Sequence, residues 1–350
     1  MARTNYGIPY KGSKNMIAEW VVSHVPECGT FFDVFAGGCA VTDCILRKGL
    51  AGHVVANDID PMPLKCFEMA VRGEFADEDR WISREAFFML KDTDPYVRFC
   101  FSFGNNTKDY MYSTTIEPYK RSIHYVLVHD YWDDFNRLCP EVCSDCRCAL
   151  NGVNDRKARR IAFQQVFTNR IKELSGDNWC APIVQGNPLY RSVKTKKPKR
   201  GLVAGDNDMH LENVIALQNL LSLERLQNIE SLQSLERLEP ALETSNLDYR
   251  ALTERILTTD RAFVYCDPPY LGTQGYGEFD YDEFFDWVLE IGHKHPVLIS
   301  EYAIDHDGFV EVNSKLKLSC FSVNGSKVVD EKLYTVKGGV GLDGSFNRDL

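Results

Sequence analysis

A strand, a glycine turn, a helix and a second strand follow one another near the N-terminus, and this order constrains the fold of the 350-residue chain most. TFFDVFAGG, Thr30 to Gly38, predicts a strand that runs into a glycine turn. CAVTDCILRKG predicts a helix ending at Gly49, and HVVANDID, His53 to Asp60, predicts the second strand. Since a β-α-β unit joins parallel neighbours, we expect a parallel sheet there.

The same alternation resumes after Pro240. RAFVYCDPPY, residues 261–270, predicts a buried strand that must stop at its two prolines, because proline cannot donate to a sheet ladder. The other elements expected here are a helix after SNLDYRAL (245–252), an amphipathic helix in YDEFFDWVLEIGHKH (281–295), a strand in PVLISEY (296–302), and a closing β-hairpin in LKLSCFSVN and EKLYTV.

Residues 96–210 interrupt that pattern. They are rich in aromatic residues, asparagine and charge and show no clear alternation, so we interpret them as an inserted, mostly helical domain. Leucine or isoleucine then recurs at every third position of 217–238, where composition favours a helix and a short solenoid is the alternative. We therefore expect a discontinuous catalytic domain, 1–95 with 245–350, around an insert at 96–244.

Composition is that of a globular protein, with 44% hydrophobic and 26% charged residues. No apolar run is as long as a membrane span, and the polar N-terminus lacks a signal-peptide core. We therefore expect a cytoplasmic protein, without membrane contact or an obligate protein partner. The net charge of −10 argues weakly against general nucleic-acid binding. RSVKTKKPKR, Arg191 to Arg200, contains basic but no acidic residues and is either a solvated loop or a phosphate-binding patch.

In an open parallel sheet, ligands bind beyond the carboxyl ends of the strands. Four candidate points lie at such ends: Phe35–Gly38, Asp58, Asp248 and Asp267. Glycines after the first strand let a ligand approach the backbone, and an acid after the second strand suits ribose hydroxyls. This pair predicts a nucleoside-containing cofactor. The sequence has no P-loop features here, which argues against a nucleoside triphosphate.

The tetrapeptide DPPY, Asp267 to Tyr270, offers hydrogen-bond acceptors beside a ring. Two prolines remove backbone donors, so the loop presents carbonyl groups and the Asp267 carboxylate, and Tyr270 adds an aromatic face. Such a clamp suits a planar ring with an exocyclic NH₂ group. If Asp267 and the Pro268 carbonyl each accept one N–H, the amine lone pair is less delocalised and more nucleophilic. A Pro-Pro turn with a capping aspartate is the alternative interpretation.

DPPY at a strand end, preceded in order by YKGSK (Tyr10 to Lys14), FAGG, NDID and NLDYRAL, resembles the S-adenosylmethionine-dependent amino-methyltransferases. Within them it is similar to the alpha-class, Dam-like DNA adenine methyltransferases, over roughly residues 5–115 and 245–337. The resemblance implies a Rossmann-like methyltransferase sheet, S-adenosylmethionine as cofactor and no metal. It also implies methyl transfer to the 6-amino group of an adenine flipped out of double-stranded DNA. A protein of the bacterial cytoplasm, encoded by the bacterium or by a phage, is the setting that the resemblance implies.

The resemblance assigns roles to individual residues. Those implied for the cofactor are Tyr10 and Lys14, which also brace the active site, Asp33, Phe35 and Gly37 at the methionine end, Asp58 at the ribose, and Asp248 at the adenine amine. Those implied for the target adenine are Asp267, Pro268, Pro269 and Tyr270. One departure is Val34, where the family usually has proline.

The target sequence stays open, because the insert has SFGNNTKDYMY in place of the motif with which Dam enzymes read their site. We expect the insert to bind DNA. The residues expected on phosphates are Arg191, Lys194, Lys196, Lys197, Lys199 and Arg200, and those expected on bases are Asn105, Asn106 and Lys108, because asparagine pairs well with adenine edges.

Two other functions are compatible with the sequence. One is an RNA or protein amino-methyltransferase with the same cofactor site, and the other is a catalytically silent DNA-binding protein of the same fold. Asp267 argues against protein-glutamine methylation, which by resemblance usually goes with asparagine there. A zinc knuckle is an alternative within the insert, at Cys139, Cys143, Cys146 and Cys148. A Cys-x-Cys pair is cramped for a tetrahedral ion, however, and the surrounding residues are compatible with a helix.

Overall fold

The computed structural model describes residues 5–175, 242–270, 279–319 and 327–342. The expected basic patch at 191–200 and the leucine repeat at 217–238 lie outside the described residues. The account below concerns the described ranges alone.

Seven strands form one sheet in the order β3-β2-β1-β4-β5-β7-β6. Neighbours from β3 to β5 are parallel, whereas β7 is antiparallel to both β5 and β6. The strands are β1 Cys28–Asp33, β2 Ala51–Asn57, β3 Leu242–Ser245, β4 Ala262–Cys266, β5 Val297–Glu301, β6 Phe309–Ser319 and β7 Lys327–Val336. The expected parallel sheet with a C-terminal hairpin is confirmed.

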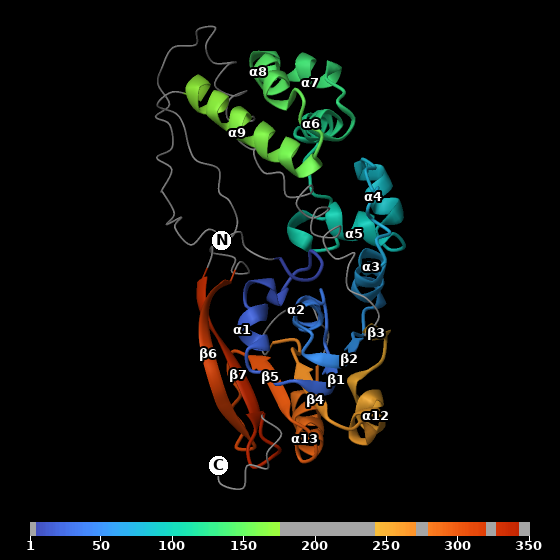
Figure 1. The fold of residues 1–350 in the computed structure, drawn as a ribbon, viewed down its shortest axis with the longest axis vertical. Helices are drawn as coiled ribbons and strands as arrows, with labels where there is room; N and C mark the ends of the chain where they lie inside the picture. The colour runs from blue at the N-terminus through green and yellow to red at the C-terminus, as the bar shows by residue number, and fades with distance from the viewer. Residues whose placement is uncertain (1–4, 176–241, 271–278, 320–326, 343–350) are drawn as a thin grey trace.

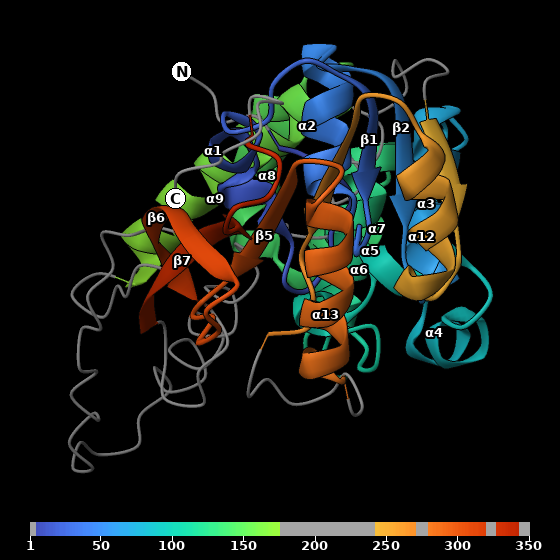
Figure 2. The same cartoon turned by 90° about the horizontal axis from the view of Figure 1, so that it is seen from below.

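Helices cover both faces of the sheet (Figures 1 and 2). Successive strand residues point to opposite faces. Phe31 therefore lies in one hydrophobic core with residues of α2 (Ala40–Lys48), whereas Phe32 lies in another with residues of α13 (Tyr281–Gly292). The remaining helices of this part are η1 Lys14–Met16, α1 Ala18–Val22, α3 Pro61–Val71, α4 Arg84–Leu90, α5 Pro95–Cys100, η5 Tyr249–Leu252 and α12 Thr253–Thr258. The sheet is thereby buried on both sides, as a parallel sheet requires.

Local sequence explains where the first helices end and begin. Gly49 takes a left-handed φ of 63° and closes α2, as expected from the sequence. Asp60 caps α3 by accepting from the Met62 N–H at 3.0 Å, and Pro61 occupies the first turn, where no donor is needed. The expected strand that runs into a glycine turn is confirmed: β1 stops at Asp33, and the chain turns from Val34 onward.

The described part of the expected insert, residues 96–175, is mostly helical. It contains α6 Glu117–His129, α7 Asp133–Leu138, α8 Pro140–Leu150 and α9 Arg156–Ser175, after a short 3₁₀ turn, η2 Phe103–Asn105. Figure 1 shows α6 to α9 grouped at one end of the molecule, away from the sheet. They share a hydrophobic core of their own, in which Phe135, Phe163 and Phe167 are buried.

Three of the four knuckle cysteines, Cys139, Cys143 and Cys146, are buried in this same core, and Cys148 is exposed. Within the described ranges, no group of three or more histidine, cysteine or acidic side chains is placed to hold a metal ion. In the same ranges, no helix combines the length and apolarity needed to cross a membrane. At the far end of the insert, β3 begins at Leu242 and pairs with β2, so the sheet takes in residues just before the expected boundary at 245.

Candidate active site

The carboxyl ends of β1, β2 and β4 lie side by side. Asp33 pairs in register with both Ala56 of β2 and Tyr265 of β4. The residues that follow these strands, among them Asp58 and Asp267, therefore leave the sheet at a common edge. This edge is where an open α/β sheet binds its ligands.

A tight turn follows β1 and is tied to the end of β2. The Gly37 N–H donates to Asp58 Oδ2 at 2.8 Å, and the Asp60 N–H donates to Asp58 Oδ1 at 2.9 Å. Gly37 has a φ of +46°, which a side chain would strain. A Cβ on Gly38 would lie 2.5 Å from Tyr10 Cβ, so Tyr10 packs directly against the turn. The bare backbone and the acid together form a cradle for a ligand.

Asp33 is the most enclosed acid of the cluster, with an exposed fraction of 1%. Its Oδ2 accepts from the Thr42 hydroxyl at 2.6 Å, whereas its Oδ1 is buried without a hydrogen-bond partner in the described part of the chain. Burial raises the pKa of Asp33 to about 7; the Thr42 hydrogen bond opposes this shift, and the nearby charges of Asp267 and Asp58 add to it. An unsatisfied buried acceptor among acids suits a cationic ligand group.

Lys14 reaches Asp267 across 253 residues of sequence. Its Nζ lies 2.6 Å from Asp267 Oδ1 and 3.4 Å from Oε1 of Glu331 on β7. Lys14 has an exposed fraction of 6% and Glu331 of 0%. Burial disfavours the Lys14 charge, but the two carboxylates outweigh burial and raise the pKa of Lys14 above its ordinary value. The ammonium therefore holds Asp267 in place at the end of β4.

Tyr270 is fixed by three neighbours. Its hydroxyl donates to Glu331, its ring meets the Tyr302 ring edge-on at a centroid distance of 4.5 Å, and Lys14 Nζ lies 4.6 Å from its ring centre. The Pro269 carbonyl also has a partner, because the Tyr281 hydroxyl donates to it. The loop of acceptors expected from DPPY is thus held rigidly by residues from β7 and α13.

Phe35 and Asp248 lie on the α12–α13 side of the same edge. The centroid of the Phe35 ring lies 5.8 Å from that of Tyr249 and 5.6 Å from that of Phe284, so the Phe35 ring is part of an apolar wall. Asp248 caps η5 and pairs with Arg250 at 2.7 Å, with an exposed fraction of 42%. An acceptor next to an apolar wall suits a planar ring that carries an amine.

Comparison with known proteins indicates which family of enzymes has a site of this kind. The model of one family, the D12 class N6 adenine-specific DNA methyltransferases, matches residues 10–140. Over these residues, the chain is similar to that family. The match takes in Tyr10, Lys14, the glycine turn and Asp58, and it makes the chain an S-adenosylmethionine-dependent N6-adenine DNA methyltransferase. The Dam-like resemblance seen in the sequence is confirmed.

The chain was also compared with curated proteins and with solved structures. No curated protein matches the chain. Among solved structures, the rRNA methyltransferase aviRa from Streptomyces viridochromogenes is similar over 91% of this chain and 82% of its own, at 13% sequence identity and a TM-score of 0.31. A likeness at that level says nothing about the substrate of the D12-class chain.

The expected base readers of the D12-class chain lie in a loop between α5 and α6. Asn106 Oδ1 accepts the backbone N–H groups of Lys108 at 2.9 Å and Asp109 at 3.0 Å, and its Nδ2 donates to Asp109 at 2.8 Å. Its amide therefore shapes the loop. Asn105 has a positive φ of 55°, and Lys108 is exposed. The basic residues from Arg191 to Arg200 lie outside the described residues.

Sequence reasoning missed Glu331, Tyr281 and Thr42. Glu331 carried a signal, because it precedes Leu333 by two residues in a strand pattern and Leu333 is a core residue. An acid on the core side of a strand is unusual and indicates a specific partner. No sequence pattern indicated Tyr281 or Thr42, because each lies on a helix whose position relative to the loops is set by tertiary packing.

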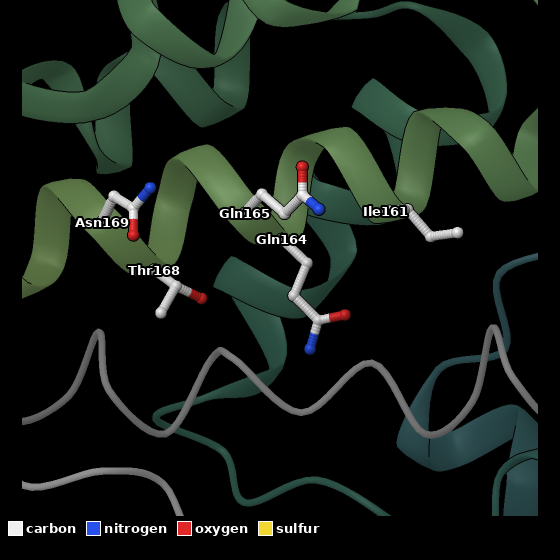
Figure 3. Close-up of a pocket in the computed structure, with 5 residues that line it drawn as sticks. All are labelled: Ile161, Gln164, Gln165, Thr168 and Asn169. Atoms are coloured by element: carbon white, nitrogen blue, oxygen red, sulfur yellow. The ribbon is translucent and has the colours of Figure 1, made fainter.

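A separate hollow runs along α9 in the insert (Figure 3). The described residues that line it are Ile161, Gln164, Gln165, Thr168 and Asn169, which lie three or four positions apart along the helix. None of them belongs to the acid cluster at the strand ends. The hollow is thus no part of the methyltransferase site.

Proposed function

We propose that this methyltransferase modifies the N6 atom of an adenine within a short, defined sequence of double-stranded DNA, after the base has left the helix. The observation that supports this most is the placement of Asp267, Pro268 and Tyr270 at the edge that also carries Asp33 and Asp58. Acceptors for an amine and acids for a cationic cofactor thus meet at one place.

The cofactor side is proposed from the fit of the residues present. Asp33 Oδ1 suits the ammonium of a methionine moiety, because it is buried and lacks a partner in the described ranges. Each Asp58 oxygen accepts one backbone N–H and has a second lone pair for a ribose hydroxyl. Gly37 lets the backbone come close, with Tyr10 packed behind it. When bound, S-adenosylmethionine supplies an electrophilic methyl group on a positively charged sulfur.

The cofactor's adenine is proposed to lie against Phe35, with its amine donating to Asp248. Asp248 already pairs with Arg250, and Arg250 also reaches Glu283 at 2.8 Å. The pair with Arg250 lowers the pKa of the Asp248 carboxyl, so the carboxylate stays an acceptor at neutral pH.

On the substrate side, Asp267 and the Pro268 carbonyl accept the two N–H groups of the target amine. Lys14 orients Asp267 through the contact of 2.6 Å. Tyr270 offers its ring to the base. Asp267 is also the acceptor in place for the proton that the amine gives up after it gains the methyl group. Positioning and exclusion of water account for most of the acceleration in this scheme.

The insert is proposed to read DNA, with residues 96–244 as a recognition region between the two catalytic segments 1–95 and 245–350. Asn105 and Lys108 are proposed base contacts, with Asn106 holding their loop. The proposed phosphate contacts are Arg191, Lys194, Lys196, Lys197, Lys199 and Arg200.

The deciding experiment is transfer of labelled methyl from S-adenosylmethionine to unmethylated plasmid DNA, followed by nucleoside analysis and single-molecule mapping. N6-methyladenine confined to one short motif is the expected result, and Asp267→Ala protein is the matched control. Methylation of adenine without a motif would contradict site specificity. Transfer to RNA or to protein amides, with none to DNA, would overturn the proposal.

A further inference from the structure

Glu331 joins three parts of the site that are distant in sequence. It lies on β7 with an exposed fraction of 0%, and its Oε1 lies 3.4 Å from Lys14 Nζ. The same oxygen accepts the Tyr270 hydroxyl. Lys14 in turn contacts Asp267 at 2.6 Å. One carboxylate therefore connects the N-terminal lysine with the aromatic end of the DPPY loop.

Charge is the first consequence of this arrangement. If Lys14 faced Asp267 alone, the ammonium would neutralise the carboxylate. With Glu331 beside it, two carboxylates share one ammonium, and the group keeps one net negative charge. Asp267 then remains a strong acceptor for the target amine, on which positive charge develops as the methyl group arrives.

Orientation is the second consequence. A tyrosine side chain whose hydroxyl makes no hydrogen bond can rotate about its two side-chain torsions. The Tyr270 hydroxyl, in contrast, donates to Glu331, and its ring contacts Tyr302 and Lys14. The face on which a base would stack is therefore set by β7, which pairs with β5 in the sheet. Holding a ring on a rigid element gives more precise placement than a loop alone.

Stability alone does not explain a glutamate at this position. Its strand neighbour Leu333 is a core residue, and burying a charged network costs desolvation that an apolar packing avoids. Replacement of whole buried ion groups by apolar residues is often neutral or stabilising. A function in the site accounts for the acid better than a contribution to folding does.

We propose that Glu331 is a positioning residue for methyl transfer: it shares Lys14 with Asp267 and fixes Tyr270 where the target adenine stacks. The proposal rests on the proposed function, since it concerns the same base-binding loop. It adds a residue from the C-terminal hairpin to a site otherwise built from strand ends.

The test compares Glu331→Gln with Glu311→Gln in the full chain. Glutamine at 331 keeps an acceptor for the Tyr270 hydroxyl but removes the charge. Glu311 is a matched acid on β6 that pairs at the surface with Lys332 at 2.7 Å. We expect Glu331→Gln to lower the single-turnover rate of methyl transfer roughly 100-fold, with the dissociation constant for S-adenosylmethionine and the melting temperature little changed. Glu311→Gln should leave all three unchanged.

A wild-type rate in Glu331→Gln would overturn the proposal. So would a loss of rate that comes together with equally weakened cofactor binding and a lower melting temperature, because that pattern indicates a structural role. Tyr270→Phe, alone and combined with Glu331→Ala, which removes the acceptor, gives a double-mutant cycle in which the two losses of rate should be less than additive.

The same cycle measured by thermal or denaturant unfolding does not depend on activity. Coupling in unfolding supports the contact between Glu331 and Tyr270, and its absence overturns the proposal even if the enzyme is active. Absence of methyl transfer to DNA by the wild-type chain would instead overturn the proposed function, and with it the role of Glu331.

Discussion

The Gly37 backbone N–H donates to Asp58 Oδ2 at 2.8 Å, so the acid that ends β2 also shapes the turn that follows β1. A second N–H, from Asp60, occupies Oδ1 of the same carboxylate. Both oxygens are needed as acceptors. An amide at this position would place an NH₂ group against one of the two backbone donors.

Asp58→Asn should therefore weaken cofactor binding, although asparagine and aspartate side chains have nearly the same size. We expect the affinity for S-adenosylmethionine to fall roughly 10- to 100-fold, because a hydrogen bond to a charged group contributes about 1.5–3 kcal/mol. Isothermal titration calorimetry measures this directly. Asp286→Asn, at an exposed position on α13, is the control and should bind normally. Unchanged affinity in Asp58→Asn would remove Asp58 from the cofactor site.

Asp33 predicts a pH dependence of stability. Burial raises its pKa from 3.8 to about 7, so the folded state favours the protonated acid. The stability that Asp33 contributes is complete below about pH 4 and is lost as the pH rises through 7. Relative to Asp33→Asn, the wild type should lose on the order of 4 kcal/mol of unfolding free energy between pH 4 and pH 8. Denaturant unfolding at several pH values measures the difference.

Cofactor binding should show the opposite trend. A cationic group needs the ionised carboxylate, so the affinity of the wild type for S-adenosylmethionine should rise from pH 6 to pH 8. The affinity of Asp33→Asn should be low and nearly flat with pH. Parallel profiles for the two proteins would show that Asp33 does not bind the cofactor.

Asp267→Ala should abolish methyl transfer, with a loss of at least about 10³-fold, because it removes an acceptor that acts on the reacting amine. Cofactor affinity should stay within a factor of a few. Asp267→Asn keeps one acceptor oxygen and should lose less. Filter binding of labelled S-adenosylmethionine and a single-turnover assay separate the two effects. Full activity in Asp267→Ala would end the clamp interpretation of DPPY.

The sequence made the gathering of Asp58 and Asp267 predictable, because strand order and strand ends follow from apolar runs, glycines and prolines. The pairing of Lys14 with Asp267 was harder to predict from the sequence. It depends on β1 lying next to β4, a contact between residues far apart in the chain. The sequence indicated Lys14 only through a family resemblance.

The strand pattern indicates that Glu331 has a specific partner but does not identify that partner. Alternation with Leu333 places it on the core side of β7, yet an acid in a strand ordinarily indicates a solvated position. Its true neighbours depend on the antiparallel register of β7 on β5, where Ile299 pairs with Tyr334. The role of Asn106 as a base reader stays a prediction, and its local hydrogen bonds to Lys108 and Asp109 compete with a contact to a base.

Asn105 and Asn106 should therefore differ on substitution. Asn106→Ala loosens the loop and should weaken binding to all DNA sequences, whereas Asn106→Asp keeps the acceptor for both N–H groups and should restore most of it. Asn105→Ala should cost about 1–3 kcal/mol at one base pair of the recognition sequence and little elsewhere. Binding to duplexes that differ by single base pairs measures both. A changed preference in Asn106→Asp would make Asn106 a base reader after all.

The basic residues from Arg191 to Arg200 predict a sequence-independent contribution to DNA affinity. Neutralising all six to glutamine should weaken binding to cognate and unrelated duplexes alike. The slope of log affinity against log salt should flatten by about 0.9 for each phosphate that the protein no longer neutralises. Replacing the four lysines of the stretch with arginine keeps the charge and is the control, with a slope like that of the wild type. A loss confined to one sequence would mean that this stretch reads bases, and an unchanged slope would mean that it is only solvated.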